Sequence, residues 1–462
     1  MHISNHILLG EPMAKTKELD PRTKVYRALS EITEKYHFAP LSEGPTANHV
    51  IPKNLVFMAL TYLLDKNHLL VGEPGWGKTT GAKILASKLS GLPYDLYDAL
   101  EIRGHPQLYQ EKIVARPHYG RLATGDESII WQGSFGLSVI MIDEANRLPL
   151  DSQDVILQGI DTGRWNYLNH SLYEGKKPTF ATMNERTGNH ENGFLPALKD
   201  RLDIVTEQVP LSTLLMFNLD EARLAVSRDL CNPQYVDTAL SALSKEYGAF
   251  TKALNAKPID GHLTAEEKAS VQKEINGMDM TKNGNDAMLF LQTFAAEINF
   301  SNRYGSKRVS DPISDETHDM NYAGICVKHS FSPRSMMGAM AYAKALAWFL
   351  QQDVSIDHVR YVLPYIIAHK ADFTDDYKNK NGNSSRLEGD NESIELAKRL
   401  VQEVTKRYAD CIQPMKNFIA RIQARNLTSA DLASIRAGNQ YDHPLMQDMI
   451  RQYQAPEKAF FE

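Results

Sequence analysis

The residues with the clearest chemical potential form a glycine-rich loop in the first quarter of the chain. Residues 72–79 read Gly-Glu-Pro-Gly-Trp-Gly-Lys-Thr and fit the pattern Gly-x-x-x-x-Gly-Lys-Ser/Thr. Such a loop turns consecutive backbone N–H groups inward around a phosphate, and the helix that follows adds its partial positive charge. The residues expected to contact a nucleotide are Gly72, Glu73, Pro74, Gly75, Trp76, Gly77, Lys78, Thr79 and Thr80.

Within this loop, two side chains have distinct expected roles. Lys78 should reach the β- and γ-phosphates, and the Thr79 hydroxyl should bind Mg²⁺. The alternative is a tight glycine turn with a solvated lysine. Trp76 is bulkier than the residues usual at its position, but the backbone does the binding, so a variable position tolerates the ring.

A carboxylate at the end of a buried strand would complete such a site. Val139-Ile140-Met141-Ile142 is followed directly by Asp143 and Glu144, and a buried strand tolerates charges only where they are paired or have a function. Asp143 is expected to hold Mg²⁺, directly or through water. Glu144 is then expected to polarise the attacking water. Capping of the next helix by the two acids is the alternative.

The elements that must position these residues alternate between short apolar runs and helical patterns. Strands are predicted at residues 68–71, 138–142 and 179–182, and helices at 23–36 and 80–89. Short buried strands separated by helices indicate a parallel sheet covered on both faces. Beyond Pro210 helices dominate, including residues 265–276, where Thr264 and Glu267 predict a capping box and Gly277 a stop.

Three further stretches follow in a fixed order: Thr182-Met183-Asn184 at a strand end, Leu198-Lys199-Asp200-Arg201, and Ser332-Pro333-Arg334 at a helix start. With the glycine-rich loop and Asp143-Glu144-Ala145-Asn146-Arg147, they resemble the AAA+ ATPase superfamily and, within it, the MoxR-like group. The resemblance spans about residues 51–370. It implies an α/β P-loop NTPase fold, with a parallel-sheet core, an all-α lid and a C-terminal helical extension.

The resemblance also assigns roles to three polar residues. Asn184 would be sensor 1, which orients the water or the γ-phosphate; an Asn that caps a turn is the alternative. Arg201 would be the arginine finger that projects into a neighbouring subunit's site. The alternative for Arg201 is a surface arginine paired to Asp200 or Asp203.

Arg334 would be sensor 2, which reaches from the helical lid to the nucleotide. Ser332 suits the N-cap and Pro333 the first helical position, so Arg334 falls in the first turn of a helix. The helix dipole disfavours a cation there, and a nearby phosphate would reverse that cost. A solvated arginine is the alternative. Arg147 is expected to join a network between subunits.

Two segments are candidates for contacting a partner. In the resembled group, residues 110–133 carry the helix-2 insert, a loop that faces a central pore. Residues 164–170, with Gly175 shortly after, indicate a β-hairpin. Its aromatic side chains could hold a partner polypeptide or simply pack against the core. Polar stretches at about 302–321 and 375–391 are predicted to be exposed loops, and a helix is predicted at about 430–437.

Composition excludes several classes of protein. The 462 residues include 51 Lys and Arg against 57 Asp and Glu, a net charge of −6, which disfavours a chain built mainly to coat nucleic acid or a membrane. The three cysteines, Cys231, Cys326 and Cys411, form no disulfide or zinc pattern. No apolar run is long enough to span a membrane. These features favour a cytoplasmic protein.

The predicted organisation has four parts: an N-terminal arm at 1–49, a nucleotide-binding core at 50–210, a helical lid at 211–370 with a long insertion at about 244–321, and a linker with a helical extension at 371–462. The insertion could be an oligomer contact, a partner-docking element or a loose segment.

The expected function is Mg²⁺-dependent ATP hydrolysis by a ring of subunits, most simply a hexamer, that remodels or activates a protein partner. The resemblance implies a partner with a von Willebrand factor A domain acting in trans, because the chain itself lacks the Asp-x-Ser-x-Ser motif of such domains. A nucleic-acid-stimulated motor of the ring-helicase type is the alternative. A scaffold that binds but scarcely hydrolyses ATP is disfavoured by the presence of Glu144, Asn184 and Arg201.

Overall fold

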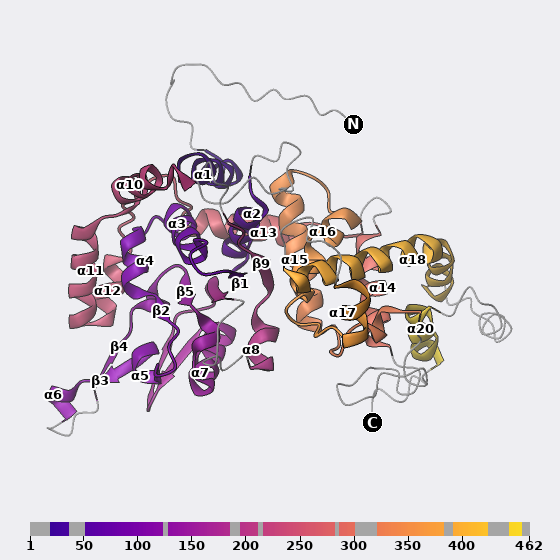
Figure 1. Cartoon of the computed structure of the whole chain (residues 1–462). Helices are drawn as coiled ribbons and strands as arrows, with labels where there is room; N and C mark the ends of the chain where they lie inside the picture. Colours follow the sequence, from indigo (N-terminus) through magenta and orange to yellow (C-terminus); the bar gives the residue numbers. More distant parts are fainter. Residues whose placement is uncertain are drawn as a thin grey trace, which may run out of the picture.

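The computed structural model describes residues 19–36, 51–122, 128–184, 195–210, 216–281, 286–300, 321–382, 391–423 and 443–454. A half built around a β-sheet lies beside a half built of helices, with α15 and α16 at the junction (Figure 1). In the described ranges no helix combines the length and the apolar composition that a membrane crossing needs.

The central sheet has five strands, all parallel, in the order β2-β5-β8-β1-β9. The three strands predicted from apolar runs are confirmed as β1, β5 and β8. Their carboxyl ends meet at one edge of the sheet, where Gly72 of β1 lies opposite Asn184 of β8. The bounds are β1 Asn67–Gly72, β2 Ile102–Arg103, β5 Ile140–Asp143, β8 Thr179–Asn184 and β9 Ile204–Glu207.

Helices cover both faces of this sheet. Almost every residue of α2 is buried, whereas α1 buries one stripe formed by Val25, Ala28, Leu29 and Ile32. Asp20 caps α1 by accepting hydrogen bonds from two backbone N–H groups of its first turn. The elements around the sheet are α1 Pro21–Lys35, α2 Lys53–Leu64, α3 Lys78–Ser90, α4 Tyr94–Leu100, α7 Leu150–Thr162 and α8 Pro196–Arg201, with short 3₁₀ turns η1 Ser134–Gly136 and η2 Ala145–Arg147.

Two small antiparallel units project from the same end of the sheet-containing half (Figure 1). The predicted hairpin is confirmed as β6 Arg164–Tyr167 and β7 His170–Tyr173. The segment expected to carry an insert folds as α5 Gln110–Ile113, β3 Ala115–Pro117, α6 Tyr119–Leu122 and β4 Ile129–Trp131. Gln110 Nε2 donates a hydrogen bond of 3.0 Å to the carbonyl oxygen of Asn166, which ties the two units together.

After residue 210 the chain is helical, as the sequence predicts, and α10, α11 and α12 lie beside α3 and α4 on the sheet-containing half (Figure 1). The capping box of α13 is confirmed, since the side chains of Thr264 and Glu267 each accept a hydrogen bond from the other's backbone N–H. The bounds are α10 Leu219–Leu230, α11 Pro233–Lys245, α12 Tyr247–Ala253, α13 Ala265–Gly277, α14 Ala287–Asn299, η4 Ala323–Ile325, α15 Pro333–Leu350, α16 Ile356–Ile367, α17 Asp375–Asn381, α18 Glu392–Gln423 and α20 Pro444–Gln454.

One loop prediction is wrong in its first part. Residues 375–381 form α17, because Thr374 caps the segment by accepting a hydrogen bond from Tyr377 N and Tyr377 is buried. The predicted loop at 302–320 and the predicted helix at 430–437 lie outside the described residues. Within 244–321, α13 packs on α1, α2 and α15, and α14 packs on α16, α18 and α20.

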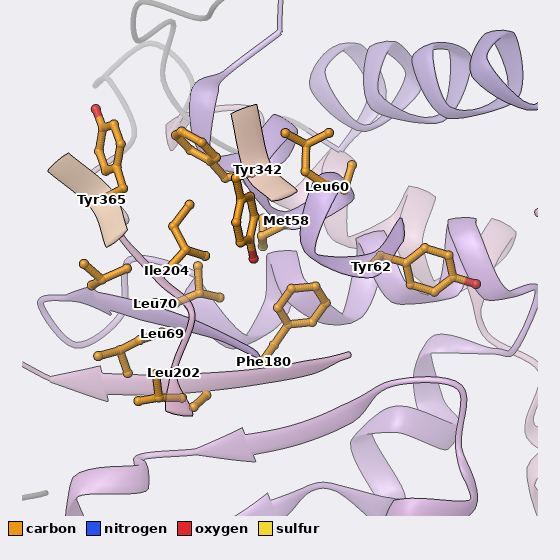
Figure 2. Close-up of a cluster of buried hydrophobic side chains, with 14 of the residues drawn as sticks. Met58, Leu60, Tyr62, Leu69, Leu70, Phe180, Leu202, Ile204, Tyr342 and Tyr365 are labelled. Atoms are coloured by element: carbon orange, nitrogen blue, oxygen red, sulfur yellow. The ribbon is translucent and has the colours of Figure 1, made fainter. Parts of the chain in front are cut away.

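A continuous apolar core joins the two halves. Tyr342 of the helical half points toward Met58 and Leu70 (Figure 2). Tyr365, also of the helical half, packs on Phe57 of α2 with the ring centroids 4.9 Å apart. Tyr342 is fully buried, and its hydroxyl lies 2.8 Å from Thr61 Oγ1 of α2. Further along the helical half, the carboxylate of buried Glu297 accepts charge-assisted hydrogen bonds from Arg407, which fastens α18 to α14.

A buried histidine lies at the centre of the sheet. His68 of β1 is fully buried, with Nε2 2.8 Å from Thr206 Oγ1 and Nδ1 3.2 Å from Thr61 Oγ1. Burial lowers the pKa of His68 to about 3, because charging the ring inside the core is costly. The folded chain therefore keeps this ring neutral at pH values where the unfolded chain protonates it.

This difference predicts a pH-dependent contribution to stability. Between pH 6.5 and 3 the unfolded chain binds the extra proton, so His68 lowers the free energy of unfolding as the pH falls. A His68→Gln variant keeps polar contacts but cannot be protonated. Its deficit in the free energy of unfolding relative to wild type should shrink by about 1.4 kcal/mol between pH 7.5 and 5.5.

Urea titrations of both proteins at the two pH values measure this change. The other buried histidines are present in both proteins, so their contributions cancel. Identical pH dependence in the two proteins would contradict the assignment.

Candidate functional site

The glycine-rich loop connects β1 to α3 in a conformation that depends on its glycines. Gly72, Gly75 and Gly77 have φ values of 142°, 83° and 79°, which side chains rarely adopt. A Cβ on Gly72 would lie 2.6 Å from the carbonyl oxygen of Gln208 and 3.4 Å from a ring carbon of Trp76. The Trp76 ring thus packs beside the loop backbone, and Lys78 and Thr79 open α3 directly after it.

The Lys78 ammonium is held at the centre of the loop. It donates hydrogen bonds of 2.9 Å and 3.0 Å to the carbonyl oxygens of Gly72 and Glu73, and one of 2.8 Å to Oδ1 of Asn184. Lys78 is buried. The contact with Asn184 brings together the ends of β1 and β8, so the residues expected to act as the phosphate-binding lysine and as sensor 1 are direct neighbours.

Asp143 lies at the end of β5 within reach of two hydroxyls. Its Oδ1 accepts hydrogen bonds from Thr79 Oγ1 at 2.5 Å and from Thr182 Oγ1 at 2.7 Å. Carboxylate and hydroxyl oxygens are hard donors that suit Mg²⁺, which proteins typically hold through one or two carboxylates together with water and substrate phosphates. Asp143 and Thr79 therefore fit the magnesium role expected of them.

Glu144 is restrained in both backbone and side chain. Its φ of 49° is left-handed, a conformation that costs a non-glycine residue free energy and needs support from its surroundings. Its backbone N–H donates to Thr182 Oγ1 at 3.0 Å, its Oε1 accepts from Asn184 Nδ2 at 2.9 Å, and its Oε2 pairs with Arg147. Arg147, expected in a network between subunits, thus pairs with Glu144 in its own chain.

Gly104 supports this strained turn from the neighbouring chain segment. Its N–H donates a hydrogen bond of 2.7 Å to the carbonyl oxygen of Asp143. A Cβ built on Gly104 would lie 2.0 Å from the carbonyl oxygen of Glu144. Since a backbone atom cannot yield as a flexible side chain can, only glycine fits here.

Arg201 and Arg334 lie together near the amino-terminal ends of the strands, on the side of the sheet opposite to the glycine-rich loop. The carbonyl oxygen of Arg201 accepts a hydrogen bond of 2.8 Å from Asn67 Nδ2, at the start of β1. Five strand residues separate this point from the glycine-rich loop, a distance of roughly 16 Å. Arg201 therefore lies away from the loop of its own chain.

Two carboxylates hold this arginine pair. Arg201 Nε lies 3.1 Å from Asp161 Oδ2, and Arg334 NH2 lies 3.3 Å from Asp161 Oδ1. Arg334 NH1 also donates to Asp200 Oδ2 at 2.9 Å. The predicted N-cap Ser332 and first helical residue Pro333 are confirmed at the start of α15. The pairing partner of Arg201 is Asp161, rather than the Asp200 or Asp203 considered from the sequence.

A cavity of about 660 Å³ opens beside the glycine-rich loop. Its walls are mainly apolar and aromatic, with Trp76 from the loop, Tyr36 from the end of α1, Tyr94 from α4 and Val226 from α10. This composition is typical of a site for a flat organic ring. Sequence reasoning could not find this cavity, because its walls come from segments that lie far apart in the chain.

Comparisons with known proteins agree with this geometry. Residues 67–202 match the family model for the AAA domain of the dynein-related subfamily. No curated protein matches the chain in sequence. Residues 67–202 therefore form an AAA domain with a P-loop α/β core, and the chain continues beyond it into a helical extension.

Among solved structures, the chain is similar to a candidate ATPase from Cytophaga hutchinsonii ATCC 33406. The match has a TM-score of 0.53 and 15% sequence identity, and it covers 83% of this chain and 95% of that one. A full-length MCM homolog from Methanopyrus kandleri gives a TM-score of 0.39 and 12% identity over 77% of this chain and 63% of that one. The first similarity supports the fold alone.

The contact at Gly104 generates a stability prediction. Gly104→Ala should lower the free energy of unfolding by about 1–3 kcal/mol, because the added methyl group overpacks the turn at Glu144. Gly277→Ala is the matched control, since a Cβ at Gly277 meets no atom within 4 Å at the end of α13.

Chemical denaturation of the two variants and wild type measures both effects. The control should be neutral or slightly stabilising, because alanine is the better helix former. A Gly104→Ala protein as stable as wild type would show that the turn can relax without cost.

Proposed function

We propose that this chain is an Mg²⁺-dependent ATPase that works as a subunit of a ring, most simply a hexamer, and remodels a protein partner in the manner of the MoxR-like group. The observation that carries the proposal is one connected set of hydrogen bonds. It joins Lys78, Asn184 and Glu144 on one side and Thr79 and Asp143 on the other, at the carboxyl ends of adjacent strands.

Each member of this set has a chemical task in hydrolysis. The loop N–H groups and Lys78 would bind the phosphates, and Asp143 with Thr79 would hold Mg²⁺, which when bound neutralises developing phosphate charge. Glu144 would polarise the attacking water. Its two oxygens already accept from Asn184 and Arg147, but carboxylate oxygens have further lone pairs, so a water can still donate to it. Asn184 lies between Lys78 and Glu144 and would align the two.

The cavity beside the loop supports an organic nucleotide rather than a simple polyphosphate. Trp76 adjoins the phosphate-binding backbone, and Tyr36 and Tyr94 supply further ring surfaces on which a base can stack. The α1 helix, which sequence reasoning treated as part of a separate arm, would thereby take part in nucleotide binding.

The positions of Arg201 and Arg334 support action between subunits. Both guanidinium groups lie at the edge away from their own loop, held by the same carboxylate of Asp161. A neighbouring subunit that presents its loop to this edge would meet two cations at once. The proposal of a ring and of a protein partner rests on this arrangement and on the resemblance of the sequence to the MoxR-like group.

The two projecting units support contact with a partner. Tyr119 and Tyr173 are each 66% exposed, and Leu168 at the turn of the β6–β7 hairpin is 68% exposed. Exposed aromatic and apolar side chains on these two neighbouring units could bind an extended segment of a partner polypeptide. Strong stimulation of ATP hydrolysis by single-stranded DNA, falling steeply with salt, would instead favour the nucleic-acid motor.

Two substitutions separate binding from chemistry. Lys78→Ala should abolish ATP binding, because it removes the ground-state contact with phosphate. Glu144→Gln should keep ATP affinity within a few-fold of wild type and lose turnover, because the Glu144 carboxylate is expected to act on the attacking water and not on the bound nucleotide. Fluorescent-nucleotide titration and phosphate release measure the two properties separately. Undiminished hydrolysis by Glu144→Gln would refute its role.

A third substitution tests action between subunits. Arg201→Ala should bind ATP nearly normally and hydrolyse it about 10³–10⁵-fold more slowly, the usual cost of removing an arginine finger. Mixed with Lys78→Ala protein, it should regain activity, because some interfaces then combine an intact loop with an intact Arg201.

The mixture needs subunit exchange, which labelled subunits can verify by energy transfer. Full activity in a verified monomer, or no loss of activity in Arg201→Ala, would contradict the proposal.

A further inference from the structure

A second cavity, of about 620 Å³, lies where the sheet meets the helical half. Its floor is the sheet face that carries Leu69, Val71 and Val205, and its walls come from α8, the start of α15, the end of α16, α17 and the start of α18. Its volume is within the range of about 300–1,000 Å³ that is typical of small-molecule sites. The P-loop residues are not among its described lining.

Three lysines line this cavity: Lys199 of α8, Lys370 after α16, and Lys378 of α17. Lys370 is partly buried, and its ammonium donates a hydrogen bond of 3.0 Å to the carbonyl oxygen of Asp200, a neutral acceptor. Burial lowers the pKa of Lys370 to about 8. The carboxylates of Asp203 and Asp200 act on this ammonium from nearby and partly oppose the shift. An anion in the cavity would add a direct hydrogen-bonded partner of opposite charge.

Two carboxylates also line the cavity, and each is already engaged by another cation. Asp200 accepts a hydrogen bond from Arg334 at 2.9 Å. Asp372 lies 3.8 Å from Lys328 Nζ and 4.0 Å from His329 Nε2. Both lining carboxylates thus have cationic partners other than the three lysines. Lys378 Nζ lies 4.0 Å from Asp375 Oδ1, an exposed pair that contributes little.

The wall also contains a buried nitrogen that needs a proton donor. His369 Nε2 lies 2.7 Å from the carbonyl oxygen of Leu202, so Nε2 carries the proton and Nδ1 is an acceptor. Burial, together with nearby lysines, holds the pKa of His369 well below its usual range, so the ring stays neutral. Nδ1 is buried and has no hydrogen-bond partner among the described residues. This nitrogen is covered by protein atoms, so a ligand hydroxyl would satisfy it by displacing the atoms that cover it.

We propose that this cavity binds a small phosphate ester that also carries hydroxyl groups, such as a sugar phosphate. The phosphate lies among Lys199, Lys370 and Lys378, and a hydroxyl donates to His369. The starts of α15 and α18, marked by Ser332 and Asn391, add partial positive charge to the same cavity.

A ligand bound in this cavity would change the contacts that hold Arg334 beside Arg201. Lys370 and Ser332 both contact Asp200, and Asp200 also holds Arg334. A ligand that draws Lys370 toward its phosphate loosens one of these contacts. The site goes beyond the proposed ATPase, and its occupancy can be measured without any hydrolysis.

The experiment titrates ribose 5-phosphate and, separately, inorganic phosphate into full-length Lys78→Ala protein by calorimetry. The Lys78→Ala background weakens phosphate binding at the P-loop. Lys199→Ala and Lys378→Ala are the test variants, because neither residue is buried and both should fold. Lys380→Ala is the matched control, since Lys380 is an exposed lysine two positions along α17 outside the cavity.

Ribose 5-phosphate should bind, and each test variant should weaken its binding by about tenfold, the usual worth of a charged hydrogen bond. The control should bind as the parent does. Absence of binding, or binding insensitive to Lys199 and Lys378, overturns the proposal. Inorganic phosphate that binds as tightly as the ester overturns the part assigned to His369 and supports the anion site. Failure here leaves the ATPase tests unaffected, because they use different variants and a different readout.

Discussion

The carboxylate of Asp143 accepts hydrogen bonds from a hydroxyl on α3 and a hydroxyl on β8, and the rest of the site is arranged around these two contacts. They fix the first turn of α3 relative to β5, and so the orientation of the phosphate-binding loop. Thr182 also accepts the N–H of Glu144, so the same hydroxyl sets the left-handed turn that follows β5. The hydrogen bonds made by Asp143 and Thr182 thereby align the phosphate-binding loop, the expected magnesium ligand and the expected water-activating acid.

This arrangement includes unfavourable conformations and buried charge, and contacts from other segments of the chain offset their free energy cost. A left-handed glutamate and a buried lysine are each unfavourable alone. Gly104 holds the turn by its N–H and by the space it leaves, and Asn184 satisfies Lys78 and Glu144 together. The large apolar core under Tyr342 keeps the helical half against the sheet, so that these small distances persist.

Sequence reasoning predicted the loop, the three central strands, the hairpin and the capped helices because each depends on residues close together in the chain. It did not find Gly104, Asp161 or Tyr36, since their roles come from contacts between segments far apart in sequence. Arg334 illustrates the boundary: its place in the first turn of α15 follows from Ser332 and Pro333, but its neighbour Asp161 follows only from the fold. The fold at 375–381 was misjudged because polar composition outweighed the Thr374 cap.

The strand order also determines when the site can be assembled during synthesis. β1 lies between β8 and β9, and both of these strands are made well after it. Until Thr179–Asn184 has left the ribosome, the apolar β1 has no sheet partner and the phosphate-binding loop has no neighbour for Lys78. Parallel pairing over such sequence separation is slow and leaves strand edges exposed. During much of its synthesis the nascent chain therefore exposes an apolar β1 that has no hydrogen-bonded partner strand. We expect this strand to be the segment at which a chaperone binds or aggregation begins.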